Sequence, residues 1–387
     1  MCIRDSLKSN PLPPAEAAVP DMQQLPAVTK MVERPRPFEV DLAVLEGMVK
    51  ELSVLFKDYK ELFNSNVMLV AVEQDNYRLT SENVRLKFPL GLVGLTVSAS
   101  VRTTDGSTVS DVLAISSLDN PADLPSIEEL KKKVKDFADN LMELKETPMI
   151  EEYYTGPVLF EGGAASRLFT DNLLSPGRLL ALRTMAPARG MLDEQLGRRI
   201  IDSRLTVKNY TTLAEYNGTP LFGCYEIDGD GVVPAAELTL VENGVFKRML
   251  NGRVPTLKAP ESTGSARFMI SPDNPMAIVS PGTIHVQASK GVGPEKLKKA
   301  LLKAAKEADL EYAYIVRRIG GEASAVYKVN VKDGKEIRVR VNNLSAPELT
   351  KLMDLKGISS DERVMNYFPN GVPASLIYPS AIIVGDV

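Results

Sequence analysis

The chain has 387 residues, 44% of them hydrophobic and 25% charged, and a formal net charge of -4. Such a chain is long enough for two globular domains with a sizeable core. Its lysines and arginines are interspersed with acidic residues and form no basic stripe, which argues against a nucleic-acid partner. No apolar run approaches the ~18 residues that a membrane helix needs, so the sequence predicts no membrane partner either.

Histidine and cysteine are scarce in this chain. His285 is the only histidine, and Cys2 and Cys224 are the only cysteines. Two cysteines are too few for a disulfide framework, and a zinc site built from His and Cys within this chain is almost excluded. A Ser-His-Asp triad would have to use His285, and no serine stands in a G-x-S-x-G motif. A magnesium or calcium site made only of carboxylates remains open.

The chain begins with a proline-rich segment, residues 1–37, that has neither a basic start nor an apolar h-region. We predict a disordered or loosely packed leader and not a signal peptide, which makes the cytoplasm the default compartment. Residues 40–59 then place apolar side chains every three or four positions, which predicts an amphipathic helix.

Four runs that are apolar, or that alternate between apolar and polar residues, follow this helix. They predict strands over 66–73, 77–88, 94–104 and 107–116. Asp105-Gly106, between the last two, is a hairpin signal. The sequence therefore predicts an antiparallel meander backed by helices.

A helix with a clear start comes next. Ser126 and Glu129 fit a capping box, and the apolar residues after them recur at helical spacing. Pro148 follows the end of this helix, and we place a domain boundary there. The prediction is an N-terminal α+β domain over 38–148 and a C-terminal domain over 149–387.

The stretch Tyr153–Phe169 has the pattern of a strand that runs directly into a helix. The apolar run Val158–Phe160 is broken at Gly162-Gly163, after which apolar residues resume at helical spacing. Glu161 stands at the junction, a place where many enzymes keep their chemistry. The alternative is a carboxylate placed at a helix N-terminus, where the helix dipole favours negative charge.

The remaining segments alternate short strands with turns and two helices. An irregular, arginine-rich excursion is predicted over 178–199. Strands are predicted over 204–207, 237–241, 245–250, 276–280, 283–288, 310–318, 326–331, 337–341 and 375–384, and helices over 294–308 and 346–353. Asn243-Gly244 and Asp333-Gly334 are hairpin signals. Antiparallel sheets with packed helices predict an α+β fold and not a doubly wound parallel sheet.

The segment Asp228-Gly-Asp230-Gly brings two carboxylates and two glycines together. A calcium-binding EF-hand loop would need Asp or Asn at position 232 and Gly at 233, and both positions hold valine. We therefore interpret the segment as a tight turn between strands. His285, in an alternating strand, is expected to be solvent-facing or hydrogen-bonded, and Cys224 is expected in the core.

Several segments, in serial order, are similar to characteristic regions of one family. They are Tyr154–Phe169, Arg204–Val207, Tyr225–Val233, Leu240–Lys247 and Ser262–Gly264. The family is TldD/PmbA, also called the modulator of DNA gyrase family, and the resemblance implies its two-domain α+β fold. The similarity runs from Phe38 to the C-terminus. It is greatest to longer variants that begin with another N-terminal segment, so we expect such a segment to be missing here.

What the resemblance implies about activity depends on one motif. TldD-like members resemble zinc proteases that carry His-Glu-x-x-x-His after this strand, with a cysteine near the C-terminus as third ligand. In this chain those positions hold Phe160, Glu161 and Ala165, and the C-terminal region has no cysteine. PmbA-like members lack the motif and pair with a metal-bearing subunit that acts on peptides.

The resemblance therefore implies a metal-free subunit, a pseudoenzyme that dimerises with a metal-bearing TldD-like paralogue and acts with it on peptide or unfolded polypeptide. Glu161 is the one remnant of catalytic machinery, and this chain is expected to hold no cofactor or metal, with zinc only in the partner. Two alternatives stay open. One is a stand-alone hydrolase whose metal has oxygen ligands such as Glu161, Asp228 or Asp230, and the other is a non-catalytic peptide-binding protein of the same fold.

Overall fold

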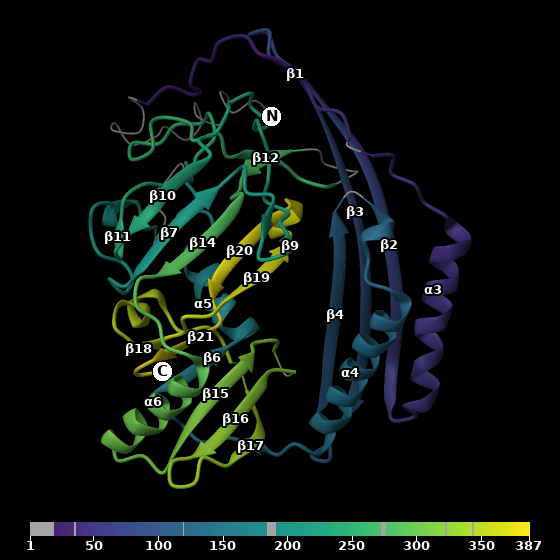
Figure 1. The fold of residues 1–387 in the computed structure, drawn as a ribbon, viewed down its shortest axis with the longest axis vertical. Coiled ribbons are helices and arrows are strands. Elements are labelled where there is room, and N and C mark those ends of the chain that lie inside the picture. The colour runs from purple at the N-terminus through teal and green to yellow at the C-terminus, as the bar shows by residue number, and fades with distance from the viewer. Residues whose placement is uncertain are drawn as a thin grey trace, which may run out of the picture.

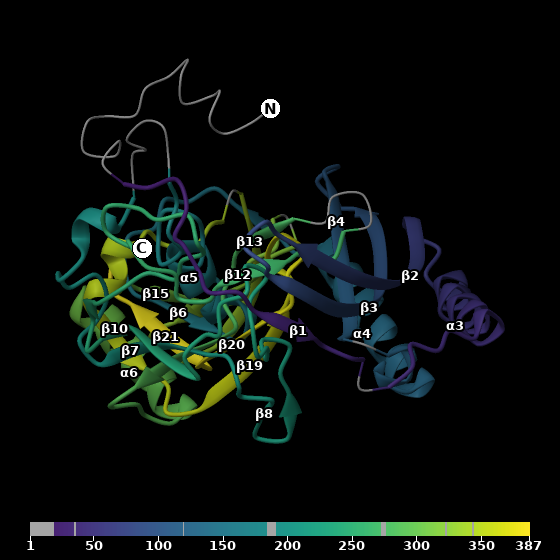
Figure 2. The same cartoon turned by 90° about the horizontal axis from the view of Figure 1, so that it is seen from above.

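A computed structural model describes residues 19–34, 36–118, 120–183, 191–271, 276–321, 323–342 and 344–387. These residues form a narrow N-terminal lobe and a larger C-terminal lobe beside it (Figures 1 and 2). Helices pack on mixed or antiparallel sheets, which confirms the predicted α+β class. Within the described ranges, no helix combines the length and apolar character needed to cross a membrane.

The N-terminal lobe is a sheet of long strands backed by two helices (Figure 2). Its elements are α3 (Leu42–Val54), η1 (Leu55–Asp58), β2 (Leu62–Leu79), β3 (Arg85–Arg102), β4 (Thr108–Leu118), η2 (Pro121–Asp123) and α4 (Ile127–Glu146). β3 pairs antiparallel with both β2 and β4, as predicted for a meander. Asp41 caps α3, and the predicted capping box of Ser126 and Glu129 starts α4. The apolar faces of both helices form one core with β3.

One predicted strand of this lobe is wrong. The alternating pattern predicts a single strand over 77–88, whereas the chain turns back between Thr80 and Val84, with β2 before the turn and β3 after it. Asn83 has a φ of 61°, and the Val84 N–H donates to Thr80 Oγ1. The alternation continues across this turn, so periodicity alone does not show it. Asparagine is one of the few residues that adopt such a φ readily.

Part of the predicted leader is ordered against both lobes. β1 (Thr29–Met31) pairs in parallel with the start of β3, at an edge that β4 does not reach. The Gln23 N–H donates to the carbonyl of Arg253 in the C-terminal lobe. Residues 19–34 of the predicted leader therefore include one short strand, β1, for which the free edge of β3 supplies backbone partners. Residues 1–18 lie outside the described ranges.

The C-terminal lobe is built on two mixed sheets. The β7 sheet has six strands, in the order β11 (Val245–Phe246), β10 (Glu237–Glu242), β7 (Leu205–Tyr210), β14 (Thr283–Ala288), β20 (Ala374–Pro379) and β19 (Glu362–Tyr367). The β6 sheet has seven, in the order β18 (Leu355–Ile358), β21 (Ala381–Val384), β6 (Val158–Glu161), β15 (Tyr312–Arg318), β16 (Ala325–Asn330), β17 (Glu336–Val341) and β5 (Met149–Ile150). Two short hairpins are separate: β8 (Glu215–Tyr216) with β9 (Thr219–Pro220), and β12 (Ala266–Phe268) with β13 (Ala277–Val279).

Helices fill the spaces around these sheets. α5 (Gly163–Leu173) packs between the two sheets, and α6 (Pro294–Glu307) covers the other face of the β6 sheet (Figure 1). β6 runs parallel to β15, and β14 runs parallel to β20, so the sheets are mixed and not purely antiparallel. Short 3-10 helices are η3 (Asp193–Gln195), η4 (Leu349–Met353) and η5 (Pro369–Gly371). The predicted excursion over 178–199 contains η3, and its residues 184–190 lie outside the described ranges.

Several predicted elements of this lobe need correction. The apolar run 375–384 is not one strand, because it divides at Ser380 into β20 and β21, which belong to different sheets. Both halves are buried and apolar, so the pattern gives no sign of the division. The helix predicted over 346–353 is only η4, and the strand predicted over 245–250 ends at Phe246. β18 and β19 were not predicted.

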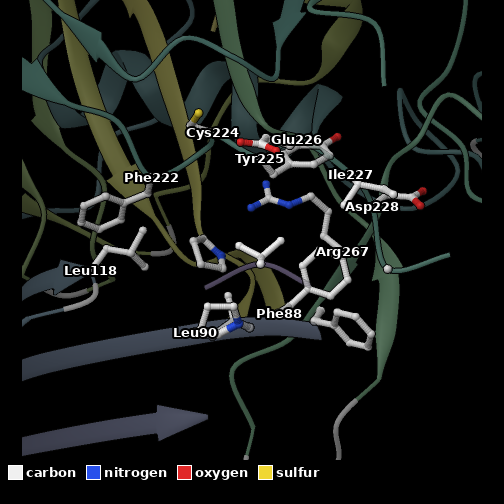
Figure 3. A pocket seen from close by; sticks show the side chains of 15 residues that line it. Phe88, Leu90, Leu118, Phe222, Cys224, Tyr225, Glu226, Ile227, Asp228 and Arg267 are labelled. Atoms are coloured by element: carbon white, nitrogen blue, oxygen red, sulfur yellow. The ribbon is translucent and has the colours of Figure 1, made fainter. Parts of the chain in front are cut away.

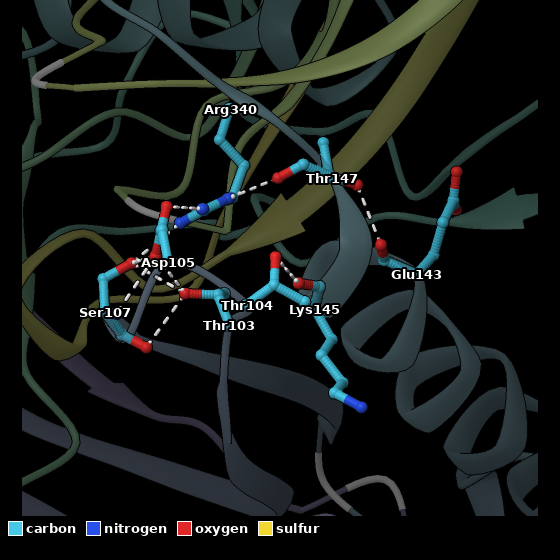
Figure 4. Close-up of polar contacts among 8 residues, drawn as sticks. All are labelled: Thr103, Thr104, Asp105, Ser107, Glu143, Lys145, Thr147 and Arg340. Atoms are coloured by element: carbon cyan, nitrogen blue, oxygen red, sulfur yellow. Dashed lines mark hydrogen bonds and ion pairs between the residues drawn. The ribbon is translucent and has the colours of Figure 1, made fainter.

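A buried arginine joins the two lobes (Figure 4). Arg340 of β17 is 3% exposed, its Nε donates to the Thr147 carbonyl at 2.9 Å, and its Nη1 donates to Ser107 Oγ at 3.0 Å. Its Nη2 pairs with Asp105 in the turn between β3 and β4. Hydrogen bonds from Ser107 and Thr103, together with Arg340, hold the pKa of the Asp105 carboxyl well below its usual range. The predicted hairpin turn therefore also connects the lobes.

Candidate functional site

The junction of β6 and α5 has the predicted arrangement of a buried strand that runs into a helix. β6 lies inside its sheet between β21 and β15, and α5 starts at Gly163. Gly162 links them with a φ of 55° and a ψ of -127°, a conformation essentially restricted to glycine. Its N–H donates to the Ser380 carbonyl at 2.8 Å. Glu161 is thereby held at the carboxyl end of β6.

The residues at the motif positions do not share one surface. Phe160 and Ala165 are fully buried in the core around α5. Because successive side chains of a strand point to opposite faces, Glu161 projects to the other face of the sheet. There its Oε2 accepts a hydrogen bond from Arg317 Nε at 3.0 Å, and Arg317 also pairs with Glu336 at 2.8 Å. Glu161 is thus a member of a chain of ion pairs.

The zinc that the motif implies does not fit these residues. Phe160 and Ala165 offer no ligand atom, and the Glu161 carboxylate is engaged by Arg317. Across the described ranges, no three side chains of His, Cys, Asp or Glu are grouped so that they could hold a metal ion. The junction has the predicted strand-to-helix arrangement, but its motif positions do not supply the ligand atoms for zinc.

His285 belongs to a different cluster, on the β7 sheet. It is 7% exposed, and its Nε2 lies 2.9 Å from Glu362 Oε1. The Tyr216 hydroxyl donates to the other oxygen of Glu362. Burial acts to raise the pKa of Glu362, but the hydrogen bonds from His285 and Tyr216 outweigh it and lower the pKa. Of the two alternatives expected for His285, solvent-facing or hydrogen-bonded, the structure shows the hydrogen-bonded one.

Asp228 and Asp230 form the predicted tight turn. Asp228 accepts hydrogen bonds from the backbone N–H groups of Asp230 at 2.9 Å, Val232 at 2.8 Å and Ala266 at 3.0 Å. Burial raises the pKa of Asp228 to about 6, although these hydrogen bonds oppose the rise. Asp230 pairs with Arg78 of β2 at 2.9 Å. Both carboxylates are therefore used within the fold.

A cavity of about 280 Å³ lies where the two lobes meet (Figure 3). Its walls include Phe88, Leu90 and Leu118 from the N-terminal lobe, and Phe222, Tyr225 and Arg267 from the C-terminal lobe. At its edge the rings of Phe88 and Phe268 pack with their centroids 5.4 Å apart. The sequence did not predict this cavity, because its walls come from segments that are far apart in the chain.

Arg267, on β12, brings a buried positive charge to the cavity wall. It is 8% exposed, its Nη1 donates to the Pro281 carbonyl at 2.7 Å, and its guanidinium carbon lies 4.2 Å from the centroid of the Tyr225 ring. Burial lowers the pKa of Arg267, since the charged form loses solvation. The only hint in the sequence is that Arg267 follows the family-like segment Ser262–Gly264.

Cys224 lines the same cavity, and the prediction for this residue was wrong. It was expected in the core, yet it is exposed. The adjacent Gly223 packs its backbone so closely on Gly282 that an added Cβ would stand 2.3 Å from the Gly282 carbonyl carbon. The close backbone packing therefore falls on Gly223, and Cys224 beside it stays exposed at the cavity.

The β7 sheet ends at β19, on the side that faces the N-terminal lobe (Figure 1). Among the described residues β19 pairs only with β20, so its other edge keeps unpaired backbone groups. Val364, Met365 and Tyr367 on this strand are half-buried. An edge of this kind can accept an extended peptide as an additional strand.

Three solved structures share the fold at low sequence identity. TldE from Thermococcus kodakarensis matches with a TM-score of 0.60 and 16% identity, covering 99% of this chain and 81% of its own. A candidate modulator of DNA gyrase from Thermotoga maritima matches with a TM-score of 0.59 and 16% identity, covering 96% and 81%. Another from Bacteroides thetaiotaomicron matches with a TM-score of 0.55 and 14% identity, covering 89% and 72%. At such identities the likeness shows the fold alone.

Sequence comparison adds the family. No curated protein matches the chain. The profile described as the PmbA/TldA metallopeptidase C-terminal domain matches residues 153–383, which is more than half of the chain and includes the β6–α5 junction and Arg267. The chain therefore belongs to the PmbA/TldA metallopeptidase family, as its resemblance implied.

Proposed function

We propose that this chain is the metal-free subunit of a PmbA/TldA-type peptidase complex and takes part in proteolysis or peptide maturation through a metal-bearing partner subunit. The β6–α5 junction carries the proposal. Phe160 and Ala165, at the positions of the motif's histidines, are fully buried apolar residues, and Glu161 pairs with Arg317. A glutamate that has no metal-bound water to deprotonate cannot act by the mechanism that the motif implies.

In such a complex this chain would help to hold the substrate. The unpaired edge of β19 supports this role, because a peptide laid along it gains main-chain hydrogen bonds whatever its sequence. The half-buried side chains of β19 add apolar contacts for alternate residues of the peptide. Such binding suits peptide or unfolded polypeptide.

Co-purification of the tagged chain with a paralogue that carries His-Glu-x-x-x-His tests the proposal, together with zinc analysis and a peptide-cleavage assay. We expect a dimer, zinc only in the partner, and cleavage that requires both subunits. Glu161→Gln is the matched variant. It should leave complex formation and cleavage unchanged, since the carboxylate serves an ion pair and not the chemistry.

Absence of a complex, together with no gain in peptide cleavage, would overturn the proposal. Stoichiometric metal in the isolated chain, with activity that Glu161→Gln abolishes, would support the stand-alone hydrolase instead. Peptide binding by the isolated chain, with no partner and no cleavage, would support a non-catalytic peptide-binding protein.

A further inference from the structure

We infer that the cavity between the lobes binds a carboxylate attached to a small apolar group, and that Arg267 pairs with that carboxylate. No residue of the β6–α5 junction or of β19 lines this cavity. Figure 3 shows the Arg267 side chain extending among the apolar side chains of the cavity wall. Three features carry the inference: an unneutralised charge, free hydrogen-bond donors and apolar walls of limited size.

Among the residues that the structure describes, Arg267 lacks the carboxylate partner that the other buried arginines have. Four of the described arginines are buried. Three of them pair with a carboxylate: Arg253 with Glu82 at 2.6 Å, Arg338 with Glu143 at 2.5 Å, and Arg340 with Asp105. Within the described ranges, no carboxylate pairs with Arg267. Because a buried cation without a counterion is unfavourable, this site is suited to an anion.

The guanidinium of Arg267 has donors to spare. It carries five N–H groups, and its one hydrogen bond to the described residues goes to the Pro281 carbonyl. The Tyr225 ring covers one face of the guanidinium, so a ligand would approach the edge, where a planar carboxylate can accept two parallel hydrogen bonds. One arginine balances a single negative charge, which suits a carboxylate better than a phosphate group of nearly two charges.

The acids in the cavity wall do not supply this carboxylate. Asp228 uses both of its oxygens on backbone N–H groups. Glu226 is exposed and pairs with Lys30 at 2.5 Å. The anion that Arg267 lacks would therefore come from a ligand.

The rest of the cavity wall favours a ligand whose remaining part is small and apolar. Phe88, Leu90, Leu118 and Phe222 supply apolar walls, and the volume of about 280 Å³ is near the lower limit of roughly 300 Å³ for small-molecule sites. A cavity of this size suits a small ligand. Two sources have this chemistry: a free apolar acid, or the C-terminal residue of a peptide. The second source rests on the proposed function.

Isothermal titration calorimetry on the isolated full chain tests the inference without a partner subunit, so its outcome does not depend on the peptidase complex. The ligands are N-acetyl-phenylalanine, which mimics a peptide C-terminus, its carboxamide, and 3-phenylpropionate. We expect N-acetyl-phenylalanine to bind and its carboxamide to bind roughly tenfold more weakly or worse, because charge-assisted hydrogen bonds are lost. Arg267→Gln should cause a similar loss, whereas the exposed Arg248→Gln should bind as the unaltered chain does.

Leu90→Trp gives a second test that leaves Arg267 in place. The indole should fill the cavity and abolish binding, and circular dichroism checks that each variant folds. If Arg267→Gln does not fold, Leu90→Trp decides alone. Equal binding of acid and carboxamide, no binding of either acid, or binding that both variants retain would overturn the inference. Binding of N-acetyl-phenylalanine but not 3-phenylpropionate would identify a peptide C-terminus as the source, and comparable binding of both would identify a free acid.

Discussion

Replacing Arg340 with methionine removes one buried set of contacts between the lobes while keeping a long unbranched side chain (Figure 4). The buried guanidinium donates to the Thr147 carbonyl and to Ser107 Oγ, and both acceptors lose this partner in the variant. Asp105 is 44% exposed and regains water, so the ion pair itself adds little. Two lost hydrogen bonds, one of them to a buried carbonyl, should lower the free energy of unfolding by about 2–4 kcal/mol.

Chemical denaturation followed by far-UV circular dichroism measures this change. Arg102→Met is the matched control, because Arg102 ends β3 beside the same turn but is exposed. A surface substitution of this kind usually changes stability by less than about 0.5 kcal/mol. If the two methionine variants unfold at the same denaturant concentration, Arg340 does not stabilise the joint between the lobes and the reasoning is refuted.

Three further predictions concern single side chains. Folding raises the pKa of Asp228 from 3.8 to about 6, so the folded chain holds this proton more tightly than the unfolded chain does. The protonated carboxyl therefore contributes its full stabilisation below pH 3.8, and this contribution is lost as the pH rises through 6. The unfolding free energy of the unaltered chain, measured against Asp228→Asn, should therefore fall by up to about 3 kcal/mol over this range, and a constant difference would contradict this. Gly162→Ala should lower the free energy of unfolding by about 1–3 kcal/mol, because alanine is strained at a φ of 55°. Gly47→Ala in α3 should raise it by up to about 1 kcal/mol, because nothing lies within 4 Å of the added Cβ and alanine favours the helix. Thermal melting compares the two variants, and an unchanged or raised melting temperature for Gly162→Ala would contradict the strain at Gly162. Glu82→Gln removes the carboxylate that pairs with Arg253, which is 2% exposed. Denaturant unfolding should show a free energy of unfolding lower by about 1–3 kcal/mol, and an unchanged value would contradict the prediction.

Motifs that act over a few residues could be read from the sequence alone. Ser126 and Glu129 start α4, and Asp105-Gly106 turns β3 into β4, because each signal depends only on near neighbours in the chain. The β6–α5 junction was predictable for the same reason, since an apolar run, two glycines and a helical repeat lie side by side. The absence of the motif's histidines is also plain in the sequence.

Contacts between distant segments settled the rest. Glu161 pairs with Arg317, 156 residues away, and the cavity at Arg267 exists only where the two lobes meet. The run 375–384 shows that its residues are buried, but not that it divides between two sheets. Hydrophobic burial is not directional, so an apolar pattern reports that a side chain is covered and not by what. An ion pair, a strand pairing or a cavity forms only between particular residues, and folding brings these residues together from distant parts of the chain.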